Sequence, residues 1–400
     1  MVPPRKIDMM EATRLTRGGR LQEAMELLLG ASAGSSGLDA DVHKRTLDVS
    51  PSTPQLLPAR TAHDGARKSD AQHIPNAEAH RRNPQLHFQL SGLLDQMSQL
   101  GSATGLDGLM GARVRAPITV PDGARFEERN YANSVGNRAY KLYVPSGCVG
   151  QPVPLVVMLH GCRQSPDDFA LGTRMNQLAE EQSFLVAYPA QSTSANASKC
   201  WNWFKTTDQE RGHGEPSLIA GITQEIMRDF KVEPGCVAVA GLSAGGAAAA
   251  IMGATYPDLF AAVGVHSGLA CGAALDVPSA FSAMRTGARD LRRRGAVRAI
   301  VFHGDRDMTV SSVNGDQVIA QSESATNSRI SISQGRSPEG ARYTRTVYTD
   351  ENGQEMMEQW VVHGLGHAWS GGSSAGSYTD PRGPDASREM LRFFLQNRRG

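Results

Sequence analysis

The stretch Ala238-Val239-Ala240-Gly241-Leu242-Ser243-Ala244-Gly245-Gly246 carries the strongest indication of fold and chemistry in this sequence. Residues 236–240 are apolar, as in a buried strand, and the residues from 247 onward are small, as in a helix packed closely on a sheet. Between them, Gly241-x-Ser243-x-Gly245 is the pattern of a nucleophile elbow, a sharp strand-to-helix turn that exposes a serine hydroxyl. Glycines two positions before and after the serine let strand and helix approach without Cβ clashes.

Length and charge restrict the classes of function. At 400 residues the chain is long enough for one large α/β domain and an appendage, and its formal net charge is +1. This charge predicts no general attraction to nucleic acid or to a membrane surface. The longest apolar runs fall short of the about 18 residues that a membrane span requires, so none is expected.

The first residues and the cysteines bear on the compartment. The segment from Met1 to Glu11 lacks the apolar core and cleavage site of a secretory signal. The chain has five cysteines, an odd number that leaves at least one unpaired in a monomer. Both observations predict a cytoplasmic protein.

Composition divides the chain into four parts. Residues 1–30 have apolar side chains at helical spacing, which predicts a short helical appendage, and residues 31–85 are rich in Ser, Pro, Ala, His and Arg without periodicity. That second part cannot bury enough surface to offset its ordering entropy, so a disordered linker is expected. Residues 86–116 predict a partly helical connector, and residues 117–400 a single catalytic domain.

The catalytic part alternates apolar runs with helical patterns after a β-hairpin at residues 124–145. Strands are expected at 154–160, 184–189, 236–240, 261–266, 299–303 and 359–363. Helices are expected at 174–182, 217–230, 247–256 and 387–396. Continuous apolar strands separated by helices indicate a mostly parallel, doubly wound α/β sheet with helices on both faces. Candidate functional residues should lie at the carboxyl ends of its strands.

Ser243 needs a base and a carboxylate to become a nucleophile, and two late strands supply both residue types. One strand is followed by Asp305 and Asp307, and the other by His363 and His367. The order Ser, Asp, His is that of the α/β-hydrolase catalytic triad. Spacing favours Asp307 and His367, while Asp305 and His363 stay open as alternatives.

Two further groups complete the candidate site. The turn after residues 156–159 contains His160-Gly161-Cys162, whose backbone predicts an oxyanion hole made by the amides of Cys162 and Ala244. Aromatic residues near these loops have two interpretations, a roof over the core or a wall of the substrate site; the candidates are Trp201, Trp203 and Trp369. Histidines without Cys or carboxylate at ligand spacing predict no metal site, and no cofactor is expected.

These motifs together resemble the esterase family of polyhydroxybutyrate (PHB) depolymerases, which are α/β-hydrolases related to feruloyl and acetylxylan esterases. The resemblance covers roughly residues 125–395. It rests on Leu159-His160-Gly161-Cys162-x-Gln164, Cys200-Trp201-Asn202-Trp203, Gly241-Leu242-Ser243-Ala244-Gly245-Gly246, His303-Gly304-x-x-Asp307 and Gly366-His367-x-Trp369. It implies the triad Ser243, Asp307 and His367, and places Cys162 near Cys200, where a disulfide could form. Members commonly have Pro where this chain has Ser370.

The resemblance implies a serine carboxylesterase that hydrolyses short-chain poly(3-hydroxyalkanoate), such as polyhydroxybutyrate or its oligomers, through an acyl-enzyme. One alternative is a feruloyl or acetylxylan type of esterase that acts on carbohydrate-linked esters. Another is a non-catalytic protein that binds polymer granules through residues 1–112. Secreted members exist, so an extracellular location is the alternative to the cytoplasm.

Overall fold

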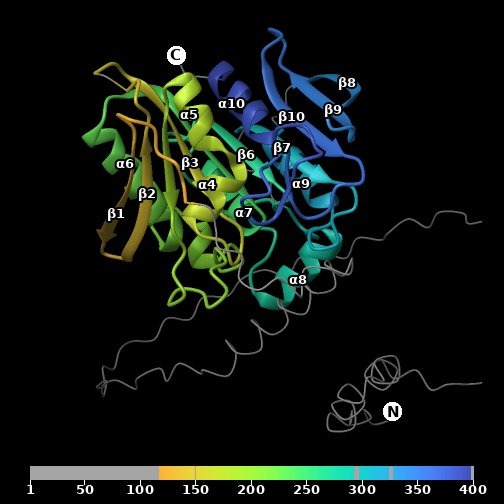
Figure 1. The fold of residues 1–400 in the computed structure, drawn as a ribbon. Helices are drawn as coiled ribbons and strands as arrows, with labels where there is room; N and C mark the ends of the chain where they lie inside the picture. Colours follow the sequence, from red (N-terminus) through yellow and green to blue (C-terminus); the bar gives the residue numbers. More distant parts are fainter. Residues whose placement is uncertain (1–116, 149, 292–296, 324–327, 398–400) are drawn as a thin grey trace, which may run out of the picture. The chain divides into compact units, whose positions relative to one another are not determined.

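The computed structural model describes residues 117–397 apart from 149, 292–296 and 324–327. The expected appendage at 1–30, linker at 31–85 and connector at 86–116 lie outside the described residues. Within the described part, ten strands form one sheet in the order β1-β2-β4-β3-β5-β6-β7-β10-β9-β8 (Figure 1).

The six central strands of this sheet are parallel. They are β4 (Leu185–Pro189), β3 (Val153–Leu159), β5 (Val232–Leu242), β6 (Ala262–His266), β7 (Arg298–Gly304) and β10 (Glu355–Val362). An antiparallel hairpin extends the sheet at each edge. The hairpins are β1 (Arg125–Asn133) with β2 (Gly136–Val144), and β8 (Arg329–Arg336) with β9 (Arg342–Thr349).

Helices cover both faces of the sheet. One face packs against α6 (Gly214–Asp229), α7 (Ala244–Thr255), α8 (Val277–Thr286) and α9 (Val313–Ser322). The other packs against α4 (Pro166–Thr173), α5 (Met175–Gln182) and α10 (Ala386–Gln396). A short 3₁₀ turn (Thr206–Gln209) precedes α6, and β11 (Trp369–Ser370) pairs with β12 (Thr379–Asp380) beside the main sheet.

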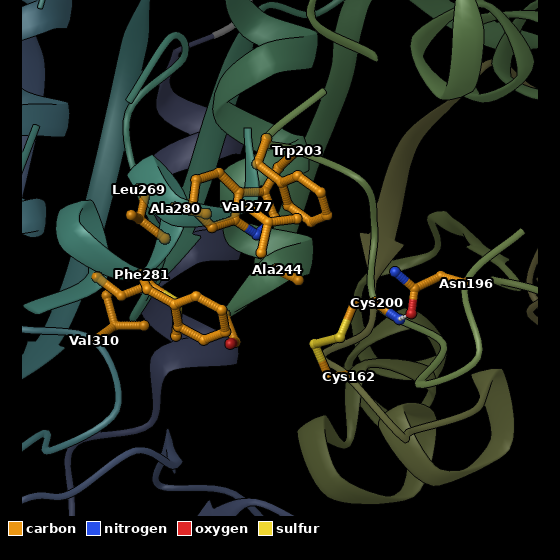
Figure 2. A pocket seen from close by; sticks show the side chains of 13 residues that line it. Cys162, Asn196, Cys200, Trp203, Ala244, Leu269, Val277, Ala280, Phe281 and Val310 are labelled. Atoms are coloured by element: carbon orange, nitrogen blue, oxygen red, sulfur yellow. Dashed lines mark hydrogen bonds between the residues drawn. A yellow bond between two sulfur atoms is a disulfide. The ribbon is translucent and has the colours of Figure 1, made fainter. Parts of the chain in front are cut away.

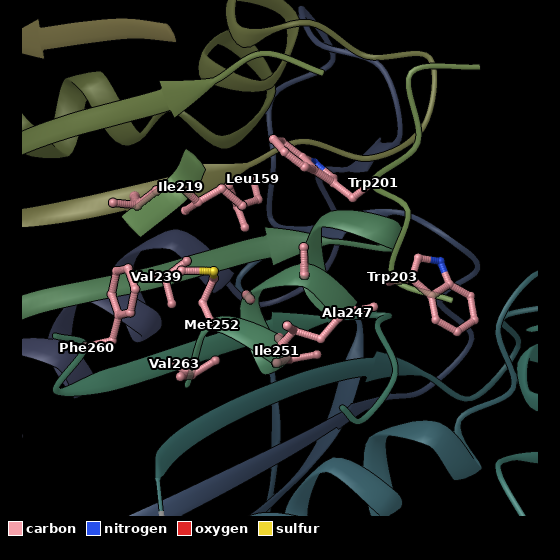
Figure 3. Packing of buried hydrophobic residues seen from close by; sticks show 14 of the residues in the cluster. Leu159, Trp201, Trp203, Ile219, Val239, Ala247, Ile251, Met252, Phe260 and Val263 are labelled. Atoms are coloured by element: carbon pink, nitrogen blue, oxygen red, sulfur yellow. The ribbon is translucent and has the colours of Figure 1, made fainter. Parts of the chain in front are cut away.

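The period of two along each central strand divides its side chains between two cores. In β3, Leu155, Val157 and Leu159 join the core under α6 and α7, whereas Val156 and Met158 join the core under α4, α5 and α10. Both sets are buried, which is why these strands read as unbroken apolar runs. Figure 3 shows the first of these cores, in which Val239 and Val263 of the sheet face Met252 of α7.

The α/β-hydrolase type of sheet and helices expected from the sequence is confirmed, with shifts at element ends. The helix expected from residue 174 starts at Met175, because Arg174 adopts a left-handed conformation (φ 57°) that separates α4 from α5. The hairpin of β8 and β9 was not predicted. Its outer strand β8 is exposed along almost its whole length, so no buried run or clear alternation of burial marks it.

No helix in the described part of the chain combines the length and the apolar character needed to cross a membrane.

A buried carboxylate joins the last helix to the last strands. Glu358 of β10 is 0% exposed and accepts hydrogen bonds from Arg345 of β9 (2.9 and 3.0 Å) and Arg392 of α10 (2.5 Å). The indole Nε1 of Trp360 donates to the same carboxylate at 2.9 Å. Burial opposes ionisation of Glu358, but the two arginines outweigh it and hold its pKa below the ordinary value.

We expect Glu358→Gln to lower the free energy of unfolding at neutral pH by about 3 kcal/mol, because it breaks a buried ion pair. Since the pKa of Glu358 is lower in the folded protein than in the unfolded chain, its contribution is present above about pH 4 and is lost as the pH falls further. Urea unfolding of both proteins between pH 7 and pH 3 measures the difference.

The matched control is Glu389→Gln, which removes a partly exposed partner of the same arginine, Arg392. Its cost should stay below about 1 kcal/mol. Equal stability of Glu358→Gln and the parent protein at pH 7 would contradict this role of Glu358.

Candidate active site

Ser243 sits at a strained turn between β5 and α7. Its backbone has φ 57° and ψ −120°, and its N–H donates to the His266 carbonyl at 2.9 Å. A Cβ on Gly241 would overlap the backbone of Gly245, and a Cβ on Gly245 would overlap the carbonyl oxygen of Leu159. The expected elbow is therefore present, and its two glycines are required by direct backbone contact between β3, β5 and α7.

The structure pairs each candidate histidine with a different aspartate. His367 Nδ1 donates to Asp307 Oδ2 at 2.7 Å, and the Asp307 side chain is fully buried. The other oxygen of Asp307 accepts the N–H groups of Thr309 (2.9 Å) and Val310 (2.8 Å). Burial opposes ionisation of Asp307, but His367 and the Val310 N–H contribute to a net lowering of its pKa.

The remaining pair lies closer to solvent. His363 Nδ1 donates to Asp305 Oδ2 at 2.9 Å, and Asp305 also accepts the N–H of Gly364 at 2.7 Å. The Thr344 hydroxyl bonds His363 Nε2 at 2.9 Å. Both ring nitrogens of His363 are thus occupied by partners. This pair connects the loop after β7 to the loop after β10.

Ser243, Asp307 and His367 follow β5, β7 and β10, which lie in one parallel run of the sheet with β6 between β5 and β7. Their loops therefore leave the same edge of the sheet. Within the described residues no hydrogen bond joins the Ser243 hydroxyl to His367. With Nδ1 donating to Asp307, the free nitrogen of His367 is Nε2, the one that a base beside a serine uses.

Two more histidines near these loops are buried and neutral. Burial lowers the pKa of His266 well below its ordinary value, and its Nε2 accepts the N–H of Ser370 at 2.9 Å. Burial also lowers the pKa of His303, whose Nε2 donates to the Val310 carbonyl at 2.8 Å. His266 therefore has a structural role, and His303 anchors the loop that carries Asp307.

The candidate oxyanion loop, residues 160–165, is held by its own side chains. His160 Nδ1 donates to the Gly161 carbonyl at 2.7 Å, and Gln164 Oε1 accepts the Gly161 N–H at 2.9 Å. In a planar trans peptide the N–H points opposite to the C=O. Fixing the Gly161 carbonyl on His160 therefore turns the Cys162 N–H to the other side, where Cys162 borders the cleft that contains Ser243.

Neither candidate oxyanion donor has an acceptor elsewhere in the described chain. The loop and turn hydrogen bonds of the described residues include no acceptor for the N–H of Cys162. The N–H of Ala244 belongs to the first turn of α7, where helices leave such groups without an intrahelical partner. Ala244 lines the same cleft as Cys162. Two N–H donors of this kind can stabilise a negative oxygen.

A mostly apolar cleft opens at Ser243. Its lining consists of Cys162, Asn196, Cys200, Trp203, Phe204, Ser243, Ala244, Leu269, Val277, Ala280, Phe281, Met284 and Val310. Figure 2 shows the Cys162 and Cys200 side chains on one side of it, across from Phe281 and Val310 on the other. The wall from α8 was not predicted from the sequence, because its side chains have the ordinary pattern of a helix packed on a core.

The structure corrects the expectation for two of the three tryptophans. Trp201 is 0% and Trp369 is 1% exposed. Trp201 packs in the core near Leu159 (Figure 3) and Trp369 against Phe169 of α4. Their indole N–H groups bond the His160 carbonyl and Ser387, each at 3.0 Å. Trp203 alone among the three lines the cleft. A pattern of aromatic residues in loops cannot distinguish a roof over the core from a substrate wall.

Cys162 and Cys200 form a disulfide with Cα atoms 4.2 Å apart, the pairing that the family resemblance implied. The bond joins the oxyanion loop to the loop that carries Trp203. Cys148, Cys236 and Cys271 are not part of a disulfide. Among the described residues, no group of three or more His, Cys, Asp or Glu side chains is placed to hold a metal ion.

Alkylation of the denatured protein without reductant should therefore modify three cysteines, and alkylation after reduction should modify all five. Intact-mass spectrometry counts the added groups, and peptide mapping should find residues 162 and 200 in one crosslinked fragment. Modification of Cys162 without reductant would contradict the disulfide.

Comparisons with known proteins find similarity to several esterases. Poly(3-hydroxyalkanoate) depolymerase C of Paucimonas lemoignei is 32% identical over 253 residues, which are 60% of each chain. Feruloyl esterase B of Neurospora crassa is 26% identical over 66% of this chain and 90% of its own. An acetyl xylan esterase from Aspergillus awamori shares the fold, with a TM-score of 0.50 at 19% identity over 68% of this chain and 99% of its own.

The depolymerases are longer than the region that matches. This chain spans 60% of the Paucimonas lemoignei enzyme and 48% of a poly(3-hydroxybutyrate) depolymerase of Ralstonia pickettii. The family described as esterase PHB depolymerase matches residues 138–342, more than half of the chain. That segment runs from β2 into β9 and contains the elbow, the oxyanion loop and Asp307. The chain therefore belongs to the esterase family of PHB depolymerases.

Proposed function

We propose that this chain is a serine carboxylesterase in which Ser243 is the nucleophile, His367 the general base and Asp307 the residue that orients the base. The observation that carries the proposal is the 2.7 Å hydrogen bond from His367 Nδ1 to Asp307, in loops that leave the same edge of the sheet as the strained elbow of Ser243. The surface pair of His363 and Asp305 has no role in this chemistry, because both nitrogens of that imidazole are engaged.

In the acylation step, His367 Nε2 takes the hydroxyl proton as the Ser243 oxygen attacks the ester carbonyl carbon. The carbonyl oxygen becomes negative and accepts the N–H groups of Cys162 and Ala244, each worth about 3 kcal/mol to the transition state. His367 then gives the proton to the departing alkoxide as the ester C–O bond breaks. Asp307 remains ionised, and it stabilises the imidazolium that forms between the two proton transfers.

In the second step water replaces the alcohol. His367 takes a proton from water, which attacks the acyl carbon, and returns it to the Ser243 oxygen as the acid leaves. The hydroxyl and His367 need a direct contact in both steps. We propose that this contact closes when substrate fills the cleft, as catalytic hydrogen bonds often tighten only in the substrate complex.

The proposed substrate is a short-chain poly(3-hydroxyalkanoate), such as polyhydroxybutyrate or its oligomers. Two similar proteins are named depolymerases of such polyesters, and among the described residues lining the cleft none is charged. An uncharged, mostly apolar cleft suits hydrophobic acyl and alcohol parts. A feruloyl or acetylxylan type of activity is the second candidate, supported by the similarity to feruloyl esterase B over 90% of that protein's length.

The disulfide bears on the proposed compartment. Disulfides persist mainly in oxidising environments, whereas cytosolic thiols are kept reduced. The Cys162–Cys200 bond therefore favours a location outside the cytoplasm, the alternative to the location that the sequence suggested. We propose that the active form of this enzyme is the oxidised one.

We expect Asp307→Asn to lower kcat for p-nitrophenyl butyrate by about 10⁴-fold, because the amide no longer stabilises the required tautomer and the imidazolium. The matched control is Asp305→Asn, the same substitution two residues away in the same loop, which should change kcat little. Equal losses in the two variants would refute the assignment of the carboxylate.

A fluorophosphonate probe should label the parent protein at Ser243 and leave Ser243→Ala unlabelled and inactive. Labelling distinguishes an esterase from a protein that only binds polymer granules, because only an activated serine reacts. A Ser243→Ala variant that keeps turnover would show that another residue carries the chemistry.

Parallel incubations of the purified protein distinguish the two substrate classes. One contains amorphous polyhydroxybutyrate, and the others contain methyl ferulate or acetylated xylan. We expect release of 3-hydroxybutyrate or its oligomers, measured by liquid chromatography, because the cleft offers apolar surface to both sides of an aliphatic ester. Release of ferulate or acetate alone would reject the polyester assignment and support the second candidate.

A further inference from the structure

The loop of residues 190–204, here called the wall loop, positions the oxyanion loop. The Gln191 N–H donates to His160 Nε2 at 3.1 Å, and Trp201 Nε1 donates to the His160 carbonyl at 3.0 Å. The Arg163 N–H donates to the Ser198 carbonyl at 2.8 Å, and the disulfide adds a covalent link. His160 in turn holds the Gly161 carbonyl that directs the Cys162 N–H. The direction of that N–H therefore depends on where the wall loop lies.

The tautomer of His160 follows from these contacts. Its Nδ1 faces a carbonyl and must donate, and its Nε2 faces the Gln191 N–H and must accept, so the ring is neutral. Burial lowers the pKa of His160 to about 4, which keeps it neutral through the working range of pH. If Gln191 moved, His160 Nε2 would lose the N–H donor that fixes the orientation of the imidazole ring.

The wall loop donates hydrogen bonds to the buried carboxylate of Glu215, which lies in the first turn of α6. Its Oε2 accepts the Asn202 N–H at 2.8 Å, and its Oε1 accepts Asn202 Nδ2 at 2.8 Å and the side-chain amide of Gln191. The same Gln191 amide donates to the Cys200 carbonyl at 2.9 Å. One carboxylate therefore binds both ends of the loop, and Cys200 connects through the disulfide to Cys162.

Burial and the neighbouring Asp208 raise the pKa of Glu215, while Arg138 and the donors of Asn202 and Gln191 oppose that shift. Arg138 of β2, 5% exposed, places a guanidinium nitrogen 3.9 Å from Glu215 Oε1 and donates to the side-chain oxygen of Gln191. Asp208 accepts the Glu215 N–H at 2.7 Å. Burying a carboxylate is costly unless it is paired and hydrogen-bonded. Three hydrogen bonds to the Glu215 carboxylate come from the wall loop, so this side chain holds that loop in place.

We propose that Glu215 is a positioning residue for the oxyanion donor, which acts through Asn202 and Gln191 of the wall loop to hold the Cys162 N–H toward Ser243. The proposal rests on the proposed esterase function. It assigns a role in catalysis to a side chain that neither touches the cleft nor belongs to the proposed triad. Displacement of the donor by about 1 Å would cost up to about 10²-fold in rate.

The substitution Glu215→Gln tests this role because it keeps the shape and removes one acceptor. A glutamine presents an oxygen on one side and an NH₂ on the other, whereas donors face both oxygens of Glu215. One donor of the wall loop must therefore meet an NH₂ group and move away. The matched control is Glu225→Gln on the same helix, whose carboxylate accepts the Tyr140 hydroxyl at 2.8 Å and does not contact the wall loop.

The experiment compares both variants with the parent protein after titration of active sites with a fluorophosphonate carried to completion. Titration removes differences in folded fraction, so kcat is expressed per reactive Ser243. For Glu215→Gln we expect kcat for p-nitrophenyl butyrate to fall at least about 10-fold, since loss of one donor costs about 10²–10³-fold, with KM nearly unchanged. Glu225→Gln should keep the parent kcat.

Parent kcat per labelled site in Glu215→Gln would overturn the proposal, and so would an equal loss in Glu225→Gln. If Glu215→Gln does not fold, Gln191→Met serves instead, because it removes the side-chain link between Glu215 and the Cys200 carbonyl while keeping the backbone N–H to His160. The same fall in kcat at constant KM is expected there, and parent kcat would refute the role. A parent protein that the probe does not label would overturn the proposed function itself, and the positioning role with it.

Discussion

Direct contact between backbones at the elbow is the constraint on which the site depends. The first turn of α7 approaches the end of β3 so closely that a Cβ at Gly245 would overlap the Leu159 carbonyl. This approach places the elbow serine beside the oxyanion loop that begins at His160, immediately after β3. A larger residue at either glycine would separate helix from strand, and the Cys162 and Ala244 amides would no longer border one cleft.

Around this contact, the histidines differ in role because their surroundings differ. Burial keeps His266 and His303 neutral, and each uses a ring nitrogen to fix a neighbouring loop. His160 is neutral for the same reason and holds the backbone of the oxyanion loop. His367 donates one ring nitrogen to a carboxylate and keeps a second nitrogen that no hydrogen bond within residues 117–397 occupies. Its side chain is 14% exposed and therefore reachable from solvent, which the proposed role of general base requires.

Much of the fold could be predicted because parallel strands buried on both faces leave unbroken apolar runs. The β8–β9 hairpin left no such trace, since its outer strand packs against little. At the site, the order Ser, Asp, His and the spacing of the last loops pointed to Asp307 and His367, the two residues that the structure hydrogen-bonds to each other. The tryptophans were predicted less well: Trp201 and Trp369 belong to the core, where their burial depends on neighbours distant in sequence.

The sequence by itself determined the elbow, the alternation of strands and helices and the kinds of reactive side chain, because these depend on local backbone geometry and on periodic burial. Only the tertiary structure decided which aspartate faces which histidine, since Asp305 and Asp307 lie two residues apart in one loop and reach different partners. Tertiary structure also decided that α8 lines the cleft and that Glu215 of α6 supports the wall loop. Such contacts join segments far apart along the chain, and no local pattern records which of them will meet.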